Sequence, residues 1–478
     1  MKGEKSRRAG ILLDISSVCG RAHKGRLGRE AEEFADFLAA AGQRVWQILP
    51  TGPRAKGNSP YSLHSSFAGN TEYIDLDKLC DLGVIEKREL SNCKSDAEGL
   101  ELAANAIGGR DSGYLRFLES ENFWLEDFAL YMAIRKDIGK IRDFWPEDIR
   151  RRESAAMLQY SKKLKKETEL IKKTQYLFFL EWRAFSNYLK NKDIKLMGDL
   201  PIYVSSDSAE VWSKPEAFLL DEKLIPSMIA GVPPDDFSEE GQLWENPVYN
   251  WTELKKEGYE FWIGRLKKNL SLFDILRLDH FRGFESYWAV PAGAKRADDG
   301  GAWYSGPGKE LIEKIKNSLN GKQIIAEDLG IVTPEVEELL TYSDWPSTRV
   351  LQFGLIDGPL STHFPLNVGA NSVLYTGTHD NDTLMGFLKS VGEAKRESFA
   401  EMLGCKRTEL FENILRAGSS SKAELFIVPM QDYLKLGSEA RMNIPGVAEG
   451  NWSWQMKASD LSDKLADSIN ELRKSSGR

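Results

Sequence analysis

Eight short apolar runs, separated by stretches with helical periodicity, limit the folds open to this chain of 478 residues more than any other feature. The runs have the length of strands, and most stop at glycine, proline or a polar turn. Strands that alternate with helices favour right-handed parallel crossovers, so eight such units predict a (β/α)8 barrel. The runs are Ile11–Ile15, Arg44–Pro50, Lys195–Ile202, Phe273–Gly283, Gln323–Gly330, Arg349–Gly354, Ser372–Asn381 and Glu424–Met430.

Two connections between these runs are long enough to be insertions. Residues 54–190, between the second and third strands, have helical patterns and are predicted to form a mainly helical subdomain. Residues 205–270, between the third and fourth strands, are predicted to be a substrate-loop insertion. The last predicted element is a helix at about residues 458–473. We therefore expect a single catalytic barrel domain over residues 1–478, without a C-terminal β-sandwich.

Composition excludes several classes of partner. The formal net charge of −8 argues against nucleic acid and anionic membranes, which select basic faces. No run of 18 apolar residues is present to span a membrane, and the charged N-terminus does not resemble a secretory signal. The cysteines are scattered without a C-x-x-C spacing, which predicts a cytoplasmic protein without disulfides or a zinc ribbon. They are Cys19, Cys80, Cys93 and Cys405.

The fourth strand carries charges where a buried barrel strand is normally apolar. Side chains alternate along a strand, so Arg277 and Asp279 share one face with Ile275, and the neighbouring leucines take the other. Arg277 is expected to hold the Asp279 carboxylate ionised. One interpretation is a structural ion pair; the other is a catalytic carboxylate at the C-terminal end of a barrel strand.

Acidic residues end four of the predicted strands, and the C-terminal rim of a barrel brings such ends together. Two of them suit glycosidic chemistry, which uses one ionised and one protonated carboxyl group. Asp279 fits the ionised nucleophile, whereas Glu327, after Ile325 and Ala326, fits a general acid whose pKa is raised by apolar surroundings. The strand-end acids are Asp199, Asp279, Glu327 with Asp328, and Asp380.

Other chemistries have weaker support. The histidines lack paired metal-ligand spacing, so neither a metal nor another cofactor is predicted. No nucleophile elbow or Cys-His signature is present. His280 and His379 each adjoin an aspartate, where they are suited to bind sugar hydroxyls; a structural role for either histidine is the alternative. For Asp380, the alternative is a helix N-cap.

Several motifs then resemble amylomaltase, the 4-α-glucanotransferase of the wider α-amylase clan. They occur in family order, and the resemblance covers nearly the whole chain. Asp-His-Phe-Arg-Gly together with Ala-Glu-Asp-Leu-Gly is the most specific pair. The motifs are Ser59–Tyr61, Phe67–Asn70, Gly198–Ile202, Arg277–Gly283, Ala326–Gly330 and Thr378–Asn381.

The resemblance implies a role for each main site residue. Asp279 would attack the anomeric carbon, Glu327 would act as acid and then base, and Asp380 would bind the distorted donor sugar. Residues 231–249 resemble the family's loop over the acceptor site. Its aromatic residues and Tyr61 are suited to stack on glucose rings, with core packing as the alternative. The predicted substrate-binding residues are Tyr61, Asp199, Phe237, Gln242, Trp244, Asn246, Arg277, His280 and His379.

Three departures from the family pattern stand out. Asp14 lies in the first strand where the family has histidine and proline before its serine. His64 replaces a smaller residue or proline, and Glu245 follows the loop tryptophan where glycine is common. None is a proposed acid or nucleophile, so they bear on acceptor preference rather than on the reaction.

The combined prediction is a retaining 4-α-glucanotransferase. It would move an α-1,4-glucan segment to an acceptor glucan or glucose through a covalent glucosyl-aspartate. The alternatives are an α-amylase-type hydrolase, a catalytically silent glucan-binding scaffold and a metal-dependent hydrolase. A retaining mechanism predicts that the two carboxyl groups lie about 5–5.5 Å apart.

Overall fold

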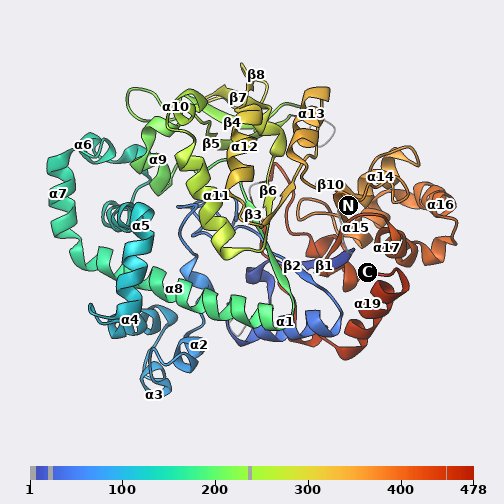
Figure 1. Cartoon of the computed structure of the whole chain (residues 1–478), viewed down its shortest axis with the longest axis horizontal. Helices are drawn as coiled ribbons and strands as arrows, with labels where there is room; N and C mark the ends of the chain where they lie inside the picture. The colour runs from blue at the N-terminus through green and yellow to red at the C-terminus, as the bar shows by residue number, and fades with distance from the viewer. Residues whose placement is uncertain (1–6, 20–24, 235–239, 448) are drawn as a thin grey trace.

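Eight parallel strands close into a barrel at the centre of the molecule (Figure 1). The computed structural model describes residues 7–19, 25–234, 240–447 and 449–478. Around the barrel the strands follow the order β1-β12-β11-β10-β9-β6-β3-β2, which confirms the predicted fold class. They are β1 (Arg8–Leu12), β2 (Val45–Gln47), β3 (Lys195–Leu200), β6 (Ile275–Leu278), β9 (Gln323–Ala326), β10 (Ser347–Val350), β11 (Ser372–Tyr375) and β12 (Leu425–Pro429).

Alternate residues of each strand fill the barrel and face the surrounding helices. Ile275 packs inside with Met197 and Ile325, whereas Leu276 and Leu278 join the larger cluster between the barrel and its helices. The inward face of β6 therefore runs from Ile275 to Arg277, as the alternation predicted. This register aims the charged residues at the carboxyl end into the barrel mouth.

A group of helices extends from one side of the barrel between β2 and β3 (Figure 1). Its longest member, α8, buries Phe178, Trp182, Phe185 and Leu189 along one stripe, and Phe185 meets Trp46 of β2 edge to face at 5.5 Å. That packing attaches the group to the barrel. The helices are α2 (Leu76–Asp81), α3 (Lys87–Leu90), α4 (Asp96–Ala106), α5 (Ser112–Ile138), α6 (Glu147–Arg150), α7 (Ser154–Lys163) and α8 (Lys165–Asn191).

A second, antiparallel sheet lies beside the barrel mouth and was not predicted. Its strands are only four to six residues long, β4 contains a glycine and β5 and β7 end in proline, so they show no clear period in the sequence. The order is β5-β4-β7-β8, with β4 (Met228–Val232), β5 (Gln242–Pro247), β7 (Ser286–Pro291) and β8 (Ala302–Ser305). Three helices share the excursion between β3 and β6: α9 (Ala209–Ser213), α10 (Trp251–Lys256) and α11 (Glu260–Leu272).

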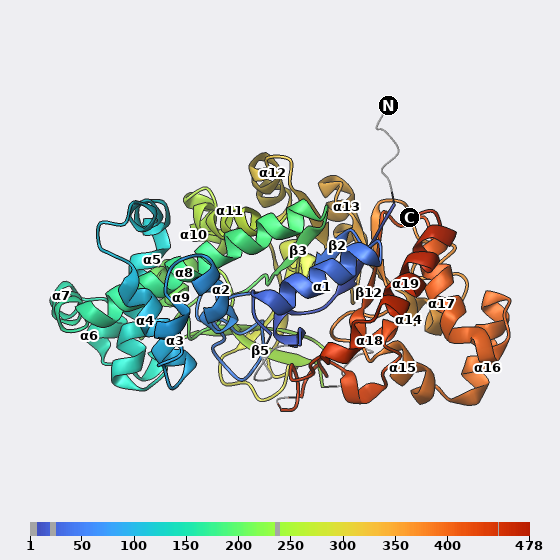
Figure 2. The ribbon, with the colours of Figure 1, turned by 90° about the horizontal axis from the view of Figure 1, so that it is seen from below.

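The C-terminal helix packs against α1 (Figure 2). The remaining helices surround the rest of the barrel, most of them on the side away from α2–α8, although α1 packs against α8 and α12 against α11 (Figure 1). These helices are α1 (Arg29–Ala40), α12 (Gly308–Ser318), α13 (Pro334–Ser343), α14 (Leu351–Asp357), α15 (Leu384–Ser390), α16 (Gly392–Leu403), α17 (Leu410–Ser420), α18 (Met430–Tyr433) and α19 (Asp463–Ser475).

Most predicted runs extend past the ends of their strands; β11, for example, ends at Tyr375, whereas its run was drawn to Asn381. Two runs were also misplaced. The sixth run was assigned to Arg349–Gly354, but its strand ends at Val350 and Leu351 begins α14. Buried Leu351 and Leu355 lie four residues apart, and so short an apolar run does not distinguish helix from strand. The first run was placed too late, because β1 ends at Leu12 and Asp14 caps a short 3-10 helix.

Candidate active site

Asp279 and Glu327 leave two neighbouring strands at the same level. Leu278 of β6 is paired with Ala326 of β9, and each acid is the next residue along its chain. Backbone hydrogen bonds extend the pairing beyond both strands, since the Glu327 N–H donates to the Leu278 carbonyl at 3.0 Å and the Asp279 N–H to the Leu200 carbonyl at 3.1 Å. The two carboxyl groups therefore meet at one barrel mouth.

The Arg277 guanidinium joins three carboxyl groups. Its Nη1 donates to both oxygens of Asp199, at 2.8 and 2.7 Å, and to Asp279 Oδ1 at 2.9 Å. Its Nη2 lies 3.7 Å from Glu327 Oε2. Arg277 and Asp199 are buried, whereas the Asp279 side chain remains 25% exposed. The least covered acid is thus the one expected to reach a substrate.

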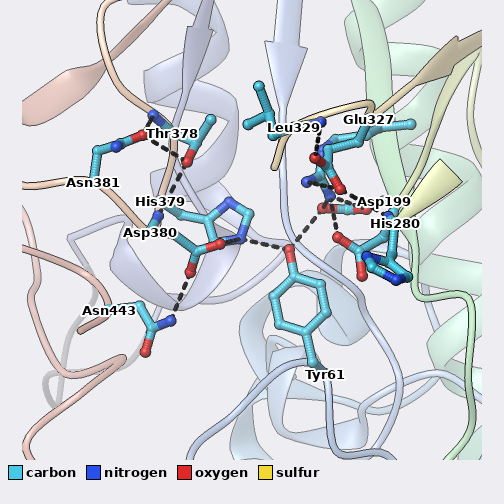
Figure 3. Close-up of polar contacts among 12 residues, drawn as sticks. Tyr61, Asp199, His280, Glu327, Leu329, Thr378, His379, Asp380, Asn381 and Asn443 are labelled. Atoms are coloured by element: carbon cyan, nitrogen blue, oxygen red, sulfur yellow. Dashed lines mark hydrogen bonds and ion pairs between the residues drawn. The ribbon is translucent and has the colours of Figure 1, made fainter. Parts of the chain in front are cut away.

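Glu327 is held by the backbone of two loops (Figure 3). Its Oε2 accepts the N–H of His280 at 2.8 Å, and its Oε1 accepts the N–H of Leu329 at 2.8 Å. His280 has a φ of 51°, in the left-handed region, where the turn after β6 directs this N–H toward the glutamate. Together with burial of the side chain, these bonds fix the carboxyl group beside Asp279.

Burial raises the pKa of both carboxyl groups. The pKa of Asp279 rises from 3.8 to about 7, because lost hydration outweighs the attraction of Arg277, and the neighbouring Asp199 and Glu327 carboxylates add to the rise. Lost hydration also raises the pKa of Glu327, against Arg277 and the two backbone N–H groups. The rise at Glu327 was predicted. At Asp279 the net shift is opposite to the one expected from Arg277 alone.

His379 and Asp380 lie on the loop after β11, across the site from Glu327 (Figure 3). Asp380 accepts from Asn443 Nδ2 at 2.6 Å, and its other carboxylate oxygen lies 3.4 Å from His379 Nε2. The N-cap of α15 is Thr383, whose side chain accepts the Gly386 N–H. The helix-cap alternative for Asp380 is therefore wrong.

Tyr61 links the two halves of the site. Its hydroxyl donates to Asp199 at 2.7 Å and lies 2.8 Å from His379 Nε2, and its ring stacks on the His379 imidazole at 5.3 Å. Trp452 packs against both rings. Asp199, Arg277 and His379 thus form one continuous polar network through the tyrosine.

Of the remaining predicted binding residues, those that the structure describes lie on β5 or contact it. Trp244 meets the His280 ring edge to face at 4.9 Å, and its indole N–H donates to Gln242 Oε1 at 3.2 Å. Burial and the Arg282 charge lower the pKa of His280 to about 4, so the ring is neutral. Asn246 donates to the Val204 carbonyl at 2.8 Å, a contact that holds the loop rather than the barrel mouth. Phe237 lies outside the described residues.

Residues near the C-terminus complete the site. Arg441 donates to the Asp380 carbonyl at 2.7 Å and to the Asn443 carbonyl at 2.7 Å, so these two residues set the position of Asp380. No spacing in the sequence connects them with Asp380 about 60 positions earlier. The segments Asn443–Gly446 and Asn451–Trp454 also resemble the amylomaltase pattern, and this resemblance is the signal that the sequence offers for them.

Within the described ranges, no group of three or more histidine, cysteine, aspartate or glutamate side chains is placed to hold a metal ion. Nor does any helix in the same ranges have the length and apolar character needed to cross a membrane.

A parallel barrel with paired carboxyl groups on adjacent strand ends has the arrangement used by enzymes that act on glycosidic bonds. A family model described as 4-alpha-glucanotransferase matches residues 13–461. The 4-alpha-glucanotransferase of Aquifex aeolicus (strain VF5) is 43% identical over 466 residues, covering 94% of this chain and 96% of the relative. That of Thermus thermophilus is 41% identical over 483 residues and covers 96% of each chain.

Among solved structures, the amylomaltase from Streptococcus agalactiae in complex with acarbose has a TM-score of 0.93 at 36% identity, with 99% of each chain covered. The chain belongs to the 4-alpha-glucanotransferase family. Its predicted activity as a glucan-transferring enzyme and its predicted α-glucan substrates are confirmed.

Proposed function

We propose that the chain transfers α-1,4-glucan segments with retention, with Asp279 as nucleophile and Glu327 as acid and base. The observation that carries this proposal is the register of β6 and β9, which brings the two acids to one guanidinium. Retaining enzymes hold their two carboxyl groups about 5–5.5 Å apart, whereas inverting enzymes leave room for a water molecule between the acids.

In the first step, an Asp279 oxygen bonds to the anomeric carbon of the donor sugar. The glycosidic bond breaks, and Glu327 gives its proton to the departing 4-oxygen. The shortened glucan leaves with a free 4-hydroxyl, and the donor segment remains as an ester of Asp279. Arg277 stabilises the carboxylate that reacts, while Asp380 binds hydroxyls of the distorted sugar as positive charge develops at its ring.

In the second step, the ionised Glu327 removes the proton from the 4-hydroxyl of an acceptor. The acceptor oxygen bonds to the anomeric carbon, and the ester bond to Asp279 breaks, which restores both acids. Two inversions give net retention. An acceptor sugar held in place reacts before water because its hydroxyl is already oriented.

Tyr61 and His379 position the donor sugar. The Tyr61 hydroxyl is occupied by Asp199 and His379, so the phenol fixes the imidazole rather than taking a proton from substrate. His379 then presents its ring to a sugar hydroxyl beside Asp380.

A cytoplasmic location also remains a proposal, supported by the four free cysteines.

Chromatography of the products from maltotriose tests the transfer reaction. We expect longer oligomers and glucose with almost no net gain of reducing ends, because each bond broken is replaced by one formed. A gain of one reducing end for each bond broken would instead identify a hydrolase.

The pH dependence should report the two acids as a coupled pair. The active form has Asp279 ionised and Glu327 protonated, so activity falls when both are protonated at low pH and when both are ionised at high pH. Burial raises both pKa values, that of Asp279 to about 7, which moves both limbs of the kcat/KM profile to higher pH than for free carboxyl groups. A profile centred near pH 4 would contradict this assignment.

A further inference from the structure

An exposed ion pair joins two segments that flank the catalytic residues. Lys56 Nζ lies 2.5 Å from Glu245 Oε2, although the residues are 189 positions apart. Their side chains are 74% and 63% exposed, so the contact belongs to the outer rim and not to the buried network. An isolated surface ion pair contributes little to the free energy of unfolding. Any function of this pair therefore depends on which two segments it connects.

Lys56 belongs to the same compact loop as Tyr61. The Ala55 N–H donates to the Ser62 carbonyl at 2.7 Å, and the His64 N–H donates to the Pro53 carbonyl at 2.7 Å. These bonds make residues 53–64 a small hairpin-like unit with Lys56 near its tip. The ion pair of Lys56 with Glu245 therefore restrains the same loop that places the Tyr61 hydroxyl against Asp199 and His379.

Glu245 occupies a backbone conformation that suits glycine better. Its φ is 60°, in the left-handed region that glutamate rarely adopts. The β4–β5 pairing is irregular here, because Leu243 pairs with Gly231 and Pro247 with Ile229. Such a bulge re-aims side chains. The chain thus keeps a carboxylate at a strained position, next to the tryptophan that packs on His280.

We propose that the Lys56–Glu245 pair is a clasp at the rim of the acceptor side that selects against longer acceptors. The inference rests on the proposed role of Glu327. The Trp244 ring contacts the His280 ring, and the backbone N–H of His280 donates to Glu327. Glu327 is the proposed acid for the departing chain and the proposed base for the acceptor. The ion pair connects β5, which carries Trp244, with the loop that carries Tyr61. A short acceptor binds on the inner side of this connection, whereas a longer acceptor has to extend beyond it.

Competition between two acceptors tests the clasp. Labelled glucose and labelled maltotetraose compete for segments from unlabelled amylose, so the donor step cancels in the ratio of label incorporated. We expect Lys56→Met and Glu245→Gln each to raise the maltotetraose-to-glucose ratio about two- to fivefold, the range that an exposed ion pair corresponds to. In the wild type, added NaCl should raise the ratio by screening the pair, and in both variants it should not.

Two further variants separate charge from structure, and a third is a control. The exchange Lys56→Glu with Glu245→Lys should restore the wild-type ratio, and Glu245→Gly should match Glu245→Gln without lowering the free energy of unfolding. Lys255→Met breaks a comparable exposed pair, with Glu310 at 2.6 Å, and should leave the ratio unchanged. A ratio that is unchanged in the Lys56→Met and Glu245→Gln variants, or a wild-type ratio that does not respond to salt, overturns the clasp. Absence of transfer to either acceptor would instead contradict the proposed function.

Discussion

Asp279→Asn should abolish transfer, with kcat lower by at least about 10⁴-fold, the scale seen when a covalent nucleophile is removed. An amide cannot form the glycosyl ester, and the remaining site can only bind and orient the sugar. Initial rates with maltotriose, followed by chromatography, measure the effect. Because asparagine has nearly the same shape and can accept the Arg277 hydrogen bond, the variant should unfold at a temperature close to that of the wild type.

Asp274→Asn is the matched control for this loss. Asp274 immediately precedes β6, at the end of the strand opposite Asp279, where it accepts the Leu196 N–H at 3.1 Å. The same chemical change on the same strand should leave kcat within about twofold, as expected for a surface substitution away from the reacting atoms. If Asp279→Asn kept a tenth of the wild-type rate, Asp279 would not be the nucleophile.

Glu327→Gln should separate two kinds of donor. With maltotriose, the rate should fall about 10²- to 10⁴-fold, because no proton reaches the departing oxygen. With a maltosyl fluoride donor, whose leaving group needs no proton, formation of the ester should be nearly normal. Release should then be slow, because no base activates the acceptor. Stopped-flow release of fluoride and mass spectrometry of the trapped enzyme measure the two steps.

Azide provides the positive test of the second step. It attacks without losing a proton, so added azide should restore turnover of Glu327→Gln and give an α-glycosyl azide. The neighbouring Asp328 is the control, because it bonds the Thr348 N–H at 2.7 Å and Arg349 at 2.9 Å. Asp328→Asn should lower stability and slow both donors equally. Equal losses with both donors in Glu327→Gln would contradict its role as acid.

The barrel fold, and the position of its acidic residues at one mouth, could be predicted from patterns within short segments of the sequence. Alternation along β6 placed Arg277 on the inner face, and parallel topology placed Asp279 and Glu327 at one end. The start of α14 at Leu351 did not follow, because a short buried apolar run fits either helix or strand. The net pKa shift of Asp279 also depends on how much water the folded chain removes, which no spacing of residues encodes.

Contacts between distant segments were the least predictable part of the site. Asn443 reaches Asp380, and Trp452 covers Tyr61, through folding of the C-terminal segment over the barrel mouth. Asparagine and tryptophan are common in loops, so the residue types give no indication of these contacts. Nor does the spacing of residues show which position of a loop will contact which strand end. The second sheet escaped prediction for a related reason, since it pairs two short strands that precede β6 with two that follow it.

The ladder bonds between β6 and β9 have a consequence for engineering this scaffold. The relative placement of the two reacting groups is fixed by strand pairing, not by the long excursions that surround it. Grafting, shortening or exchanging those excursions should change which polymers are accepted while the spacing of the chemistry stays constant. New product ranges can therefore be sought outside the barrel without rebuilding its centre.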